Sequence, residues 1–216
     1  MEKKPARHTR ERIAACALAL FNAHGAAAVT PVAIALEIGI SPGNLHYHFH
    51  NKGELVGELL SRYEAEIAPL LEAASLSDDV EDLWQFAHRL FDTLARYRFL
   101  FRDLNALMAD YPAIAPRLKR LIARKEDAAR RALAGLSQSG QLVADEAARG
   151  MLAVNLSLIG TCWLAYDEAR SGTAANAPAR GASQMMLAAA PWLTSDAGAR
   201  LARLSRDALA RPGQRG

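Results

Sequence analysis

The sequence predicts an all-α fold, with an N-terminal three-helix helix-turn-helix domain joined to a larger helical domain. Alanine, leucine, arginine and glutamate dominate the 216 residues, and these residue types favour helices. Alternating runs of β-branched residues, which mark strands, do not appear. Apolar residues instead recur at helical spacing between short breaks rich in glycine, proline and serine. With 51% hydrophobic residues, the chain is long enough to bury one or two cores.

The first predicted element is an amphipathic helix from Arg7 to His24. Its apolar positions Ile13, Ala17, Leu20 and Phe21 fall on one face at helical spacing. A basic arm precedes and opens this helix, formed by Lys3, Lys4, Arg7 and Arg10. We therefore expect a helix with one buried face and a positively charged beginning.

A second, short helix is predicted to begin after Thr30. The Thr30 hydroxyl can cap it, and Pro31 at the first helical position lacks only an amide hydrogen that would be unpaired there. Ile34 and Ala35 fall on its inner face, and Ala35 is small enough for close approach by another helix. Gly39 can take the positive φ that ends a helix, so a tight turn should follow.

A third helix repeats this start with Ser41 and Pro42. Leu45 and Phe49, four residues apart, give it a buried stripe. The side chains left outside are then polar or aromatic, namely Asn44, His46, Tyr47 and His48. A helix of this kind, held by a partner helix across a tight turn, suits the major groove of DNA.

The order of these features resembles the DNA-binding domain of the TetR family of bacterial transcriptional regulators. The resemblance covers residues 7 to 56 and rests on L-x-Y-H-F at the end of the third helix and N-K-x-E-L from Asn51 to Leu55. It departs at His46, where many members carry tyrosine, so the operator sequence stays open. It implies a DNA-binding domain over residues 1–52 and a ligand-binding and dimerisation domain over residues 53–216.

The resemblance and the exposed face together suggest a set of contacts to double-stranded DNA, made by Thr30, Ser41, Asn44, His46, Tyr47, His48 and Lys52. His46 and Tyr47 would reach base edges or phosphates, with Ser41 and Asn44 at the groove-facing start of the helix. Thr30, His48 and Lys52 would hold phosphates. Lys52 opens a helix whose unpaired amides already favour an anion.

Beyond residue 52, periodicity predicts helices at 52–75, 79–95, 97–108, 111–139, 145–170 and 178–193, and a helical or frayed tail from 196. Pro69 is expected to bend or end the first of these. Aromatic residues in this part suggest a pocket for a small-molecule effector of unknown identity, with candidate contacts Trp84, His88, Phe91, Phe99 and Tyr111. The resemblance implies such a pocket, and YRFLFRDL at 97–104 resembles one branch of the family. The alternative is that these aromatics only fill a core.

Two late helices are apolar over more of their circumference than one core contact requires. The candidate dimer-interface residues on them are Leu152, Leu156, Ile159, Met185 and Trp192. The resemblance implies a homodimer built on these helices, which matches a palindromic operator. The alternative is a pair of helices buried wholly inside one chain. The expected mechanism is a repressor that a small molecule releases from DNA.

Other function classes find little support in the sequence. No Ser/His/Asp, Cys/His, glycine-rich phosphate loop or paired-carboxylate pattern is visible, so neither an enzyme nor a cofactor is expected. His46, His48 and His50 alternate, but the helix ends near His50, and we expect no metal site. The alternative from another class is a helical small-molecule-binding or catalytic protein whose helix-turn-helix serves protein contact.

Location and redox chemistry follow from the same composition. No apolar run approaches the length of a membrane span, and the basic N-terminus lacks the apolar block of a signal peptide, so we expect a cytoplasmic protein without a membrane partner. Cys16 and Cys162 lie far apart within apolar helical patterns, which suggests no disulfide.

Overall fold

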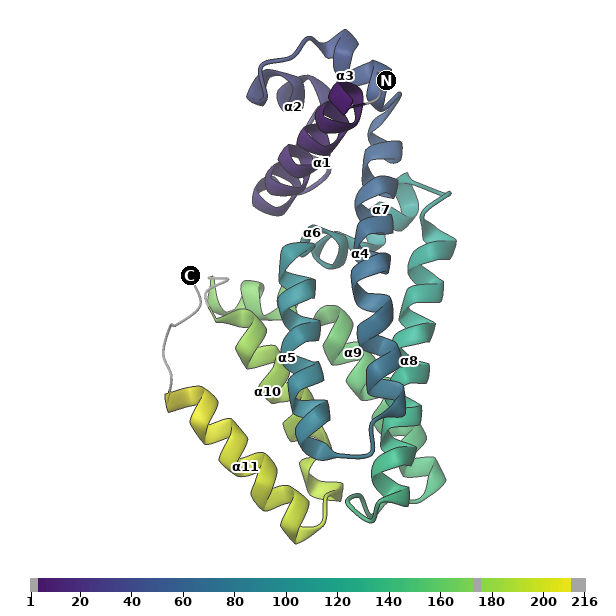
Figure 1. Cartoon of the computed structure of the whole chain (residues 1–216), viewed down its shortest axis with the longest axis vertical. Coiled ribbons are helices and arrows are strands. Elements are labelled where there is room, and N and C mark those ends of the chain that lie inside the picture. Colours follow the sequence, from purple (N-terminus) through teal and green to yellow (C-terminus); the bar gives the residue numbers. More distant parts are fainter. Residues whose placement is uncertain (1–3, 173–175, 211–216) are drawn as a thin grey trace. The chain divides into compact units, whose positions relative to one another are not determined.

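The computed structural model describes residues 4–172 and 176–210, and helices make up nearly all of that range (Figure 1). The helices are α1 (Lys4–His24), α2 (Pro31–Glu37), α3 (Pro42–His48), α4 (Lys52–Leu76), α5 (Val80–Arg96), α6 (Phe99–Arg102), α7 (Leu104–Asp110), α8 (Ala115–Gln138), α9 (Glu146–Ser171), α10 (Ala177–Ala189) and α11 (Ser195–Ala210), with a 3₁₀ turn at Ala190–Trp192. One isolated antiparallel bridge joins Leu142 to Leu193, and no strand occurs in the described residues. The all-α prediction is confirmed.

The first of two compact units comprises the described residues up to Ala65 together with Arg96–Leu118. It contains α1 to α3, the first part of α4, and α6 and α7, and α2 packs against both α1 and α3 (Figure 1). Its core is formed by fully buried side chains of several helices, among them Phe21, Ile34, Phe49, Tyr63 and Phe99. Because residues 96–118 contact the end of α1 and the first part of α4, this unit joins segments far apart in sequence.

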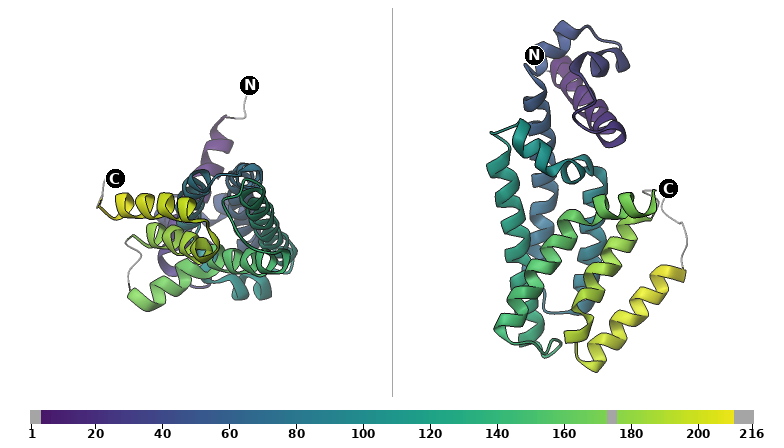
Figure 2. Two further views of the ribbon diagram at one scale, coloured as in Figure 1. Left: turned by 90° about the horizontal axis from the view of Figure 1, so that it is seen from below. Right: turned by 180° about the vertical axis from the view of Figure 1, so that it is seen from behind.

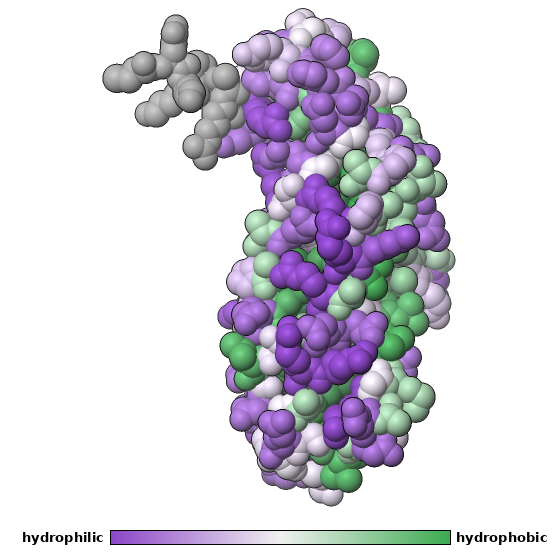
Figure 3. Space-filling model, turned by 90° about the vertical axis from the view of Figure 1, so that its right-hand side faces the viewer, coloured by the Kyte–Doolittle hydropathy of each residue, from purple (hydrophilic) through white to green (hydrophobic). Residues whose placement is uncertain are grey.

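The second unit comprises Glu66–Ala95 and the described residues from Lys119 onward. It is a bundle in which α9 packs along α10, and α10 in turn contacts α11 (Figure 2). The outer side of α8 is hydrophilic (Figure 3), with the exposed charged residues Lys119, Arg120, Arg124, Asp127, Arg130 and Arg131. Packing defines these units, and the functional division after residue 52 stays a prediction.

The structure corrects the single helix predicted at 97–108, which is broken into α6 and α7 at Asp103. The Asp103 backbone has φ −105° and ψ 23°, outside the helical region. Its carboxylate accepts a hydrogen bond from the amide of Ala26, 3.2 Å away, beyond the end of α1. The carboxylate at the break is thus tied to the end of α1, and local periodicity cannot predict a contact of this kind.

Pro69 lies inside α4, which continues through it to Leu76, so of the two expected effects the end of the helix is excluded and the bend stays a prediction. The sequence was expected to hold no helix of membrane-spanning length, yet α9 reaches that length and hydropathy. Core helices of other proteins meet the same criterion, and 33% of the apolar window is buried inside the chain. The length and hydropathy of α9 are therefore no evidence that it spans a membrane.

Candidate nucleic-acid interface and effector cavity

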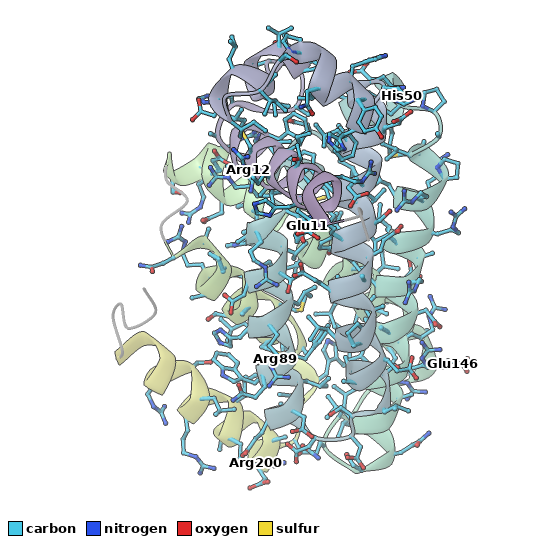
Figure 4. All side chains as sticks on the ribbon, turned by 45° about the horizontal axis from the view of Figure 1, so that its top comes forward. Glu11, Arg12, His50, Arg89, Glu146 and Arg200 are labelled. Atoms are coloured by element: carbon cyan, nitrogen blue, oxygen red, sulfur yellow. The ribbon has the colours of Figure 1, made fainter. Side chains whose placement is uncertain are left out.

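The helix-turn-helix begins and turns as its residues predict. Thr30 Oγ1 accepts a hydrogen bond from the amide of Ala33 at 3.1 Å, which caps α2. Gly39 has φ +69°, the left-handed conformation that favours glycine, and it reverses the chain before α3. Arg12 of α1 (Figure 4) donates a 3.0 Å hydrogen bond to the carbonyl of Ile38 at the end of α2. The turn between α2 and α3 is thus held by the backbone conformation of Gly39 and by the hydrogen bond from Arg12.

The third helix presents its polar side chains to solvent. Ser41 Oγ accepts from the amide of Asn44 at 3.1 Å, capping α3. Leu45 is buried, whereas Tyr47 is 75% exposed. The other exposed or half-buried predicted contacts on this helix and its cap are Ser41, Asn44, His46 and His48. The structure therefore leaves the predicted contacts on α3 and its cap accessible, around the part of the helix that Leu45 does not anchor.

Arg10 holds the end of this helix, a role the sequence did not reveal. Its guanidinium donates to the carbonyl of His48 at 2.6 Å and to Glu58 at 2.9 Å, and lies 4.0 Å from the centre of the Phe49 ring. Burial opposes ionisation of Glu58, but hydrogen bonds from Arg10 and Arg62 hold the pKa of its carboxyl below the usual value. Arg10 therefore braces α3 against α1 and α4. Lys3 and the side chains of Lys4 and Arg7, the rest of the predicted basic arm, lie outside the described residues.

The Lys52 ammonium is hydrogen-bonded to backbone carbonyls of the same chain. Its Nζ donates to the carbonyls of Ala26 at 2.8 Å, Val29 at 3.2 Å and Ala27 at 3.4 Å, all in the loop between α1 and α2. The ammonium thereby fixes the loop that leads into the Thr30 cap. The predicted contact with phosphate stays a prediction, and it now has to be compatible with this clamp.

A second set of arginines joins α6 to the end of α1. Arg98 donates to the carbonyl of Asn22 at 3.0 Å, and Arg102 donates to the carbonyls of Asn22 at 3.2 Å and Phe21 at 3.0 Å. The Asn22 side chain in turn accepts from the amide of Phe99 and donates to the carbonyl of Arg96. The Phe21 carbonyl also accepts from the amide of Gly25 at 2.9 Å, so these bonds add side-chain partners to the last turn of α1.

An apolar cavity of about 60 Å³ lies within the second unit. Its lining comes from α4, α5, α8, α9 and α10 and includes Leu71, Leu90, Leu133, Leu156, Met185 and Met186. Two polar side chains, Lys125 and Ser157, also line it. Lys125 is 4% exposed, and its Nζ donates a 2.9 Å hydrogen bond to the carbonyl of Gly160. Burial lowers the Lys125 pKa from 10.5 to about 7, against a smaller opposing effect of Cys162.

Lys125 was not among the residues singled out from the sequence, although the sequence contains a signal for it. Leu118, Leu121, Ala128 and Ala132 are the buried positions around it on α8, and Lys125 continues their spacing. A lysine inside an apolar helical stripe is unusual, because lysine is seldom fully buried. The position of Lys125 within this apolar stripe is therefore a sequence signal for a buried lysine.

The predicted pocket residues are divided between the two units. Trp84, His88 and Phe91 lie on α5 in the second unit, where the Trp84 and His88 rings meet edge to face at 4.7 Å. Phe99 packs on Phe21 in the first unit, with ring centres 5.3 Å apart. Tyr111 borders a hollow of about 220 Å³ beside the end of α1. None of these residues lines the apolar cavity.

The predicted interface residues differ in exposure. Leu152 and Met185 are buried within the chain, Leu156 and Ile159 are half-buried, and Trp192 is 39% exposed. The apolar residues that α9 exposes are instead Met151, Val154, Leu158 and Tyr166, and α10 adds Leu187. On α9 these residues recur at intervals of three, four and eight, so they form one stripe.

The alternating histidines do not converge on a common point. The His46 and His50 rings stack with centres 5.4 Å apart, and His50 lies beyond the end of α3 (Figure 4). Within residues 4–172 and 176–210, no group of three or more histidine, cysteine or acidic side chains is placed to hold a metal ion.

Family comparison now adds to this geometry. A family model described as bacterial regulatory proteins of the tetR family matches residues 13–59. A second model, TetR, described as a bacterial transcriptional repressor, matches residues 62–201, which is more than half of the chain. The chain belongs to the TetR family. TetR proteins are transcriptional regulators and not a family of enzymes.

Solved structures share the fold of this TetR-family chain. A TetR-family transcriptional regulator from Marinobacter aquaeolei VT8 superposes with a TM-score of 0.83 at 29% identity, covering 93% of this chain and 98% of that one. CprB from S. coelicolor A3(2) gives 0.71 at 18% identity, covering 95% and 98%. SmeT, the repressor of the Stenotrophomonas maltophilia multidrug efflux pump SmeDEF, gives 0.63 at 19% identity, covering 89% and 94%. No curated protein matches the chain.

Proposed function

We propose that this TetR-family chain is a ligand-responsive repressor that binds a palindromic operator as a homodimer. The observation that carries the proposal is the outer face of α3, where Asn44, His46 and Tyr47 are exposed while Leu45 anchors the helix inside. A helix presented in this way can enter the major groove, whose base edges differ for every base pair.

The roles on DNA follow from chemistry and position. Asn44, His46 and Tyr47 read base edges, because each carries hydrogen-bonding groups on the exposed face. Ser41 lies at the groove-facing start of α3, and His48 contacts phosphate near its end. The Thr30 oxygen accepts from the α2 backbone, which leaves its hydroxyl hydrogen for a phosphate oxygen.

Lys52 contributes to phosphate binding because its ammonium lies close to Thr30. Its ammonium bonds the carbonyl of Val29, the residue before Thr30, so its positive charge lies next to the α2 cap. A phosphate held at Thr30 then meets both the hydroxyl and the charge. Phosphate contacts of this kind fix the register of the protein and weaken as salt rises.

The exposed stripe on α9 supports a homodimer. Met151, Val154, Leu158 and Tyr166 form an apolar surface on one face of a long helix, and Leu187 adds to it from α10. Burial of such a stripe against its symmetry mate releases apolar surface from water. A two-fold pair of recognition helices then fits half-sites about one turn of DNA apart, roughly 34–36 Å.

The effector is proposed to bind in the apolar cavity of the second unit. The repressor SmeT, a structural relative of this chain, has been solved in complex with triclosan. By linkage, an effector that lowers the affinity of the protein for DNA must itself bind less tightly to the DNA-bound protein. The two affinities fall by the same factor. We assign the chain no catalytic step and place it in the cytoplasm, where its DNA target lies.

Selection of DNA sites from a random duplex library tests this function without knowledge of the operator. Wild type should enrich one motif with inverted half-sites, and Tyr47→Ala should enrich none. A library that stays random with wild type would refute sequence-specific binding. A single unrepeated half-site would refute the homodimer and leave DNA binding in place.

A further inference from the structure

The wall of the effector cavity is hydrocarbon apart from two polar side chains, Lys125 of α8 and Ser157 of α9. The helices α4, α5 and α10 contribute only apolar side chains, such as Leu71, Leu90 and Met185. Among the described residues that line the cavity there is no acid. An organic cation bound there would therefore be buried without an opposite charge, which is costly.

The two polar side chains differ in the hydrogen bonds that they make to the opposite helix. Lys125 Nζ donates to the carbonyl of Gly160 at 2.9 Å, an ordinary hydrogen-bond length. Ser157 is only 6% exposed, and its hydroxyl reaches the carbonyl of Ile122 at 3.5 Å. Hydrogen bonds from a hydroxyl to an oxygen usually measure roughly 2.5–3.0 Å, so this contact is weak. The Ser157 hydroxyl is thus buried in a hydrocarbon wall with little compensation from Ile122.

The direction of the Ser157 side chain also sets it apart from an ordinary helical serine. A serine inside a helix commonly bonds a carbonyl of its own preceding turn. Ser157 instead turns away from α9 toward α8, to a carbonyl 35 positions away in sequence. That carbonyl lies inside α8, so it keeps its helical partner whether or not Ser157 is present. The fold therefore gains little from a hydroxyl at this point of the cavity wall.

The chemistry of this hydroxyl decides which ligand group fits it. Its hydrogen is directed at the Ile122 carbonyl, so the lone pairs of Oγ are what Ser157 offers to a ligand. The ligand must therefore donate a hydrogen. A carboxylate, a ketone and an ether can only accept, and a protonated amine finds no acid in the described lining. A neutral hydroxyl meets both conditions.

We propose that the effector of this protein is a small uncharged molecule with an apolar body and one hydroxyl, an alcohol or a phenol, which donates a hydrogen bond to Ser157 Oγ. This inference rests on the proposed function, in which the cavity holds the effector. The hydrocarbon of the remaining wall suits the apolar body, and further polar groups on the ligand would be buried against it. The flexible side chains of Met185 and Met186 can adjust to the shape of that body.

Calorimetric titration of the full-length, DNA-free protein tests the site. The probes are 1-hexanol and 4-ethylphenol, each beside its methyl ether, which keeps the oxygen and the apolar body but has no hydrogen to donate. Wild type should bind at least one hydroxyl compound about five times more tightly than its ether, as expected for one hydrogen bond between neutral groups. Ser157→Ala should lose this preference and still bind the ether, which shows that its cavity is intact.

The matched control is Ser75→Ala, which should keep the wild-type preference. It removes a hydroxyl that bonds the carbonyl of Glu72 within α4, and Ser75 does not line the cavity. Equal affinity of wild type for the hydroxyl compound and its ether would overturn the proposal, as would a preference that survives in Ser157→Ala. Binding of none of the probes would overturn it too. The assay contains no DNA, so these results leave the DNA function in place.

A second measurement tests whether the hydroxyl compound acts as an effector. With a duplex selected from the random library, the compound should weaken DNA binding by wild type at about one fifth of the concentration that its ether requires. In Ser157→Ala the two compounds should act at the same concentration. Binding in the calorimeter without any change in DNA affinity would overturn the role as effector. A protein that showed the preference but selected no DNA motif would instead refute the proposed function alone.

Discussion

Replacing Lys125 by methionine is expected to stabilise the folded protein, and to do so most at low pH. Methionine has a similar length, carries no charge and matches the apolar lining of the cavity. Gly160 lies inside α9, so its carbonyl keeps a helical partner when the lysine is removed. The substitution therefore removes a buried charge, and the Gly160 carbonyl stays hydrogen-bonded.

The magnitude follows from the lysine pKa, which burial lowers from 10.5 to about 7. A pKa difference of one corresponds to about 1.4 kcal/mol, so burial of the ammonium costs about 5 kcal/mol below pH 7. Between these two pKa values the unfolded chain binds more protons than the folded one, so wild type gains stability as pH rises. From pH 7 to pH 9 this gain is about 2 kcal/mol.

The assay is urea unfolding followed by circular dichroism at pH 7 and pH 9, with protein concentration held constant because a dimer's stability depends on it. Lys125→Met should exceed wild type in free energy of unfolding at pH 7, and the excess should shrink by about 2 kcal/mol at pH 9. Lys119→Met is the control and should show no such change. An excess that is equal at the two pH values would refute the reasoning, as would a less stable Lys125→Met at pH 7.

Three further substitutions test the packing and the interface. Gly181→Ala should destabilise the protein by about 1–3 kcal/mol in thermal unfolding, because the added Cβ would overlap the Phe91 ring. Arg10→Met should lower the stability by about 1 kcal/mol and weaken binding to every DNA sequence, since the brace on α3 is lost. Lys52→Met should also weaken binding to all sequences alike and reduce the salt dependence of log K by about one, measured by anisotropy at several salt concentrations.

Each of these three predictions would be contradicted by a specific result. Gly198→Ala is the control for the first, because nothing lies within 4 Å of the added Cβ, and equal melting temperatures of the two variants would contradict the packing. An Arg10→Met protein with unchanged melting temperature and DNA affinity would show that the brace is dispensable. A Lys52→Met protein with altered sequence preference and an unchanged salt slope would exclude its phosphate role.

The sequence predicted the local features of the helix-turn-helix because short-range chemistry determines them. The Thr30 and Ser41 caps, the Gly39 turn and the buried Leu45 each depend on neighbours within a few residues. Helix positions were likewise predictable from periodicity. Local signals are sufficient wherever the partner of a group lies on the same or the next turn.

Features that depend on distant partners were not predictable in this way. At the break, the Asp103 carboxylate accepts a hydrogen bond from the amide of Ala26, 77 positions away in sequence. Lys52 and Arg10 looked like free positive charges, yet they bind carbonyls and an acid of other elements. Aromatic residues suggested a pocket wall, and Phe86 does line the cavity, but its other lining side chains are mainly aliphatic. The size and polarity of a side chain do not reveal which helix of the folded protein it packs against.

The central claim is sequence-specific DNA binding by the exposed face of α3. We would test it by fluorescence anisotropy of the purified protein with the DNA upstream of its own gene, at two salt concentrations, with wild type beside Tyr47→Ala. The account predicts saturable binding by wild type that resists competitor DNA and is lost in Tyr47→Ala. Weak binding that is equal in both proteins and disappears at higher salt would contradict it.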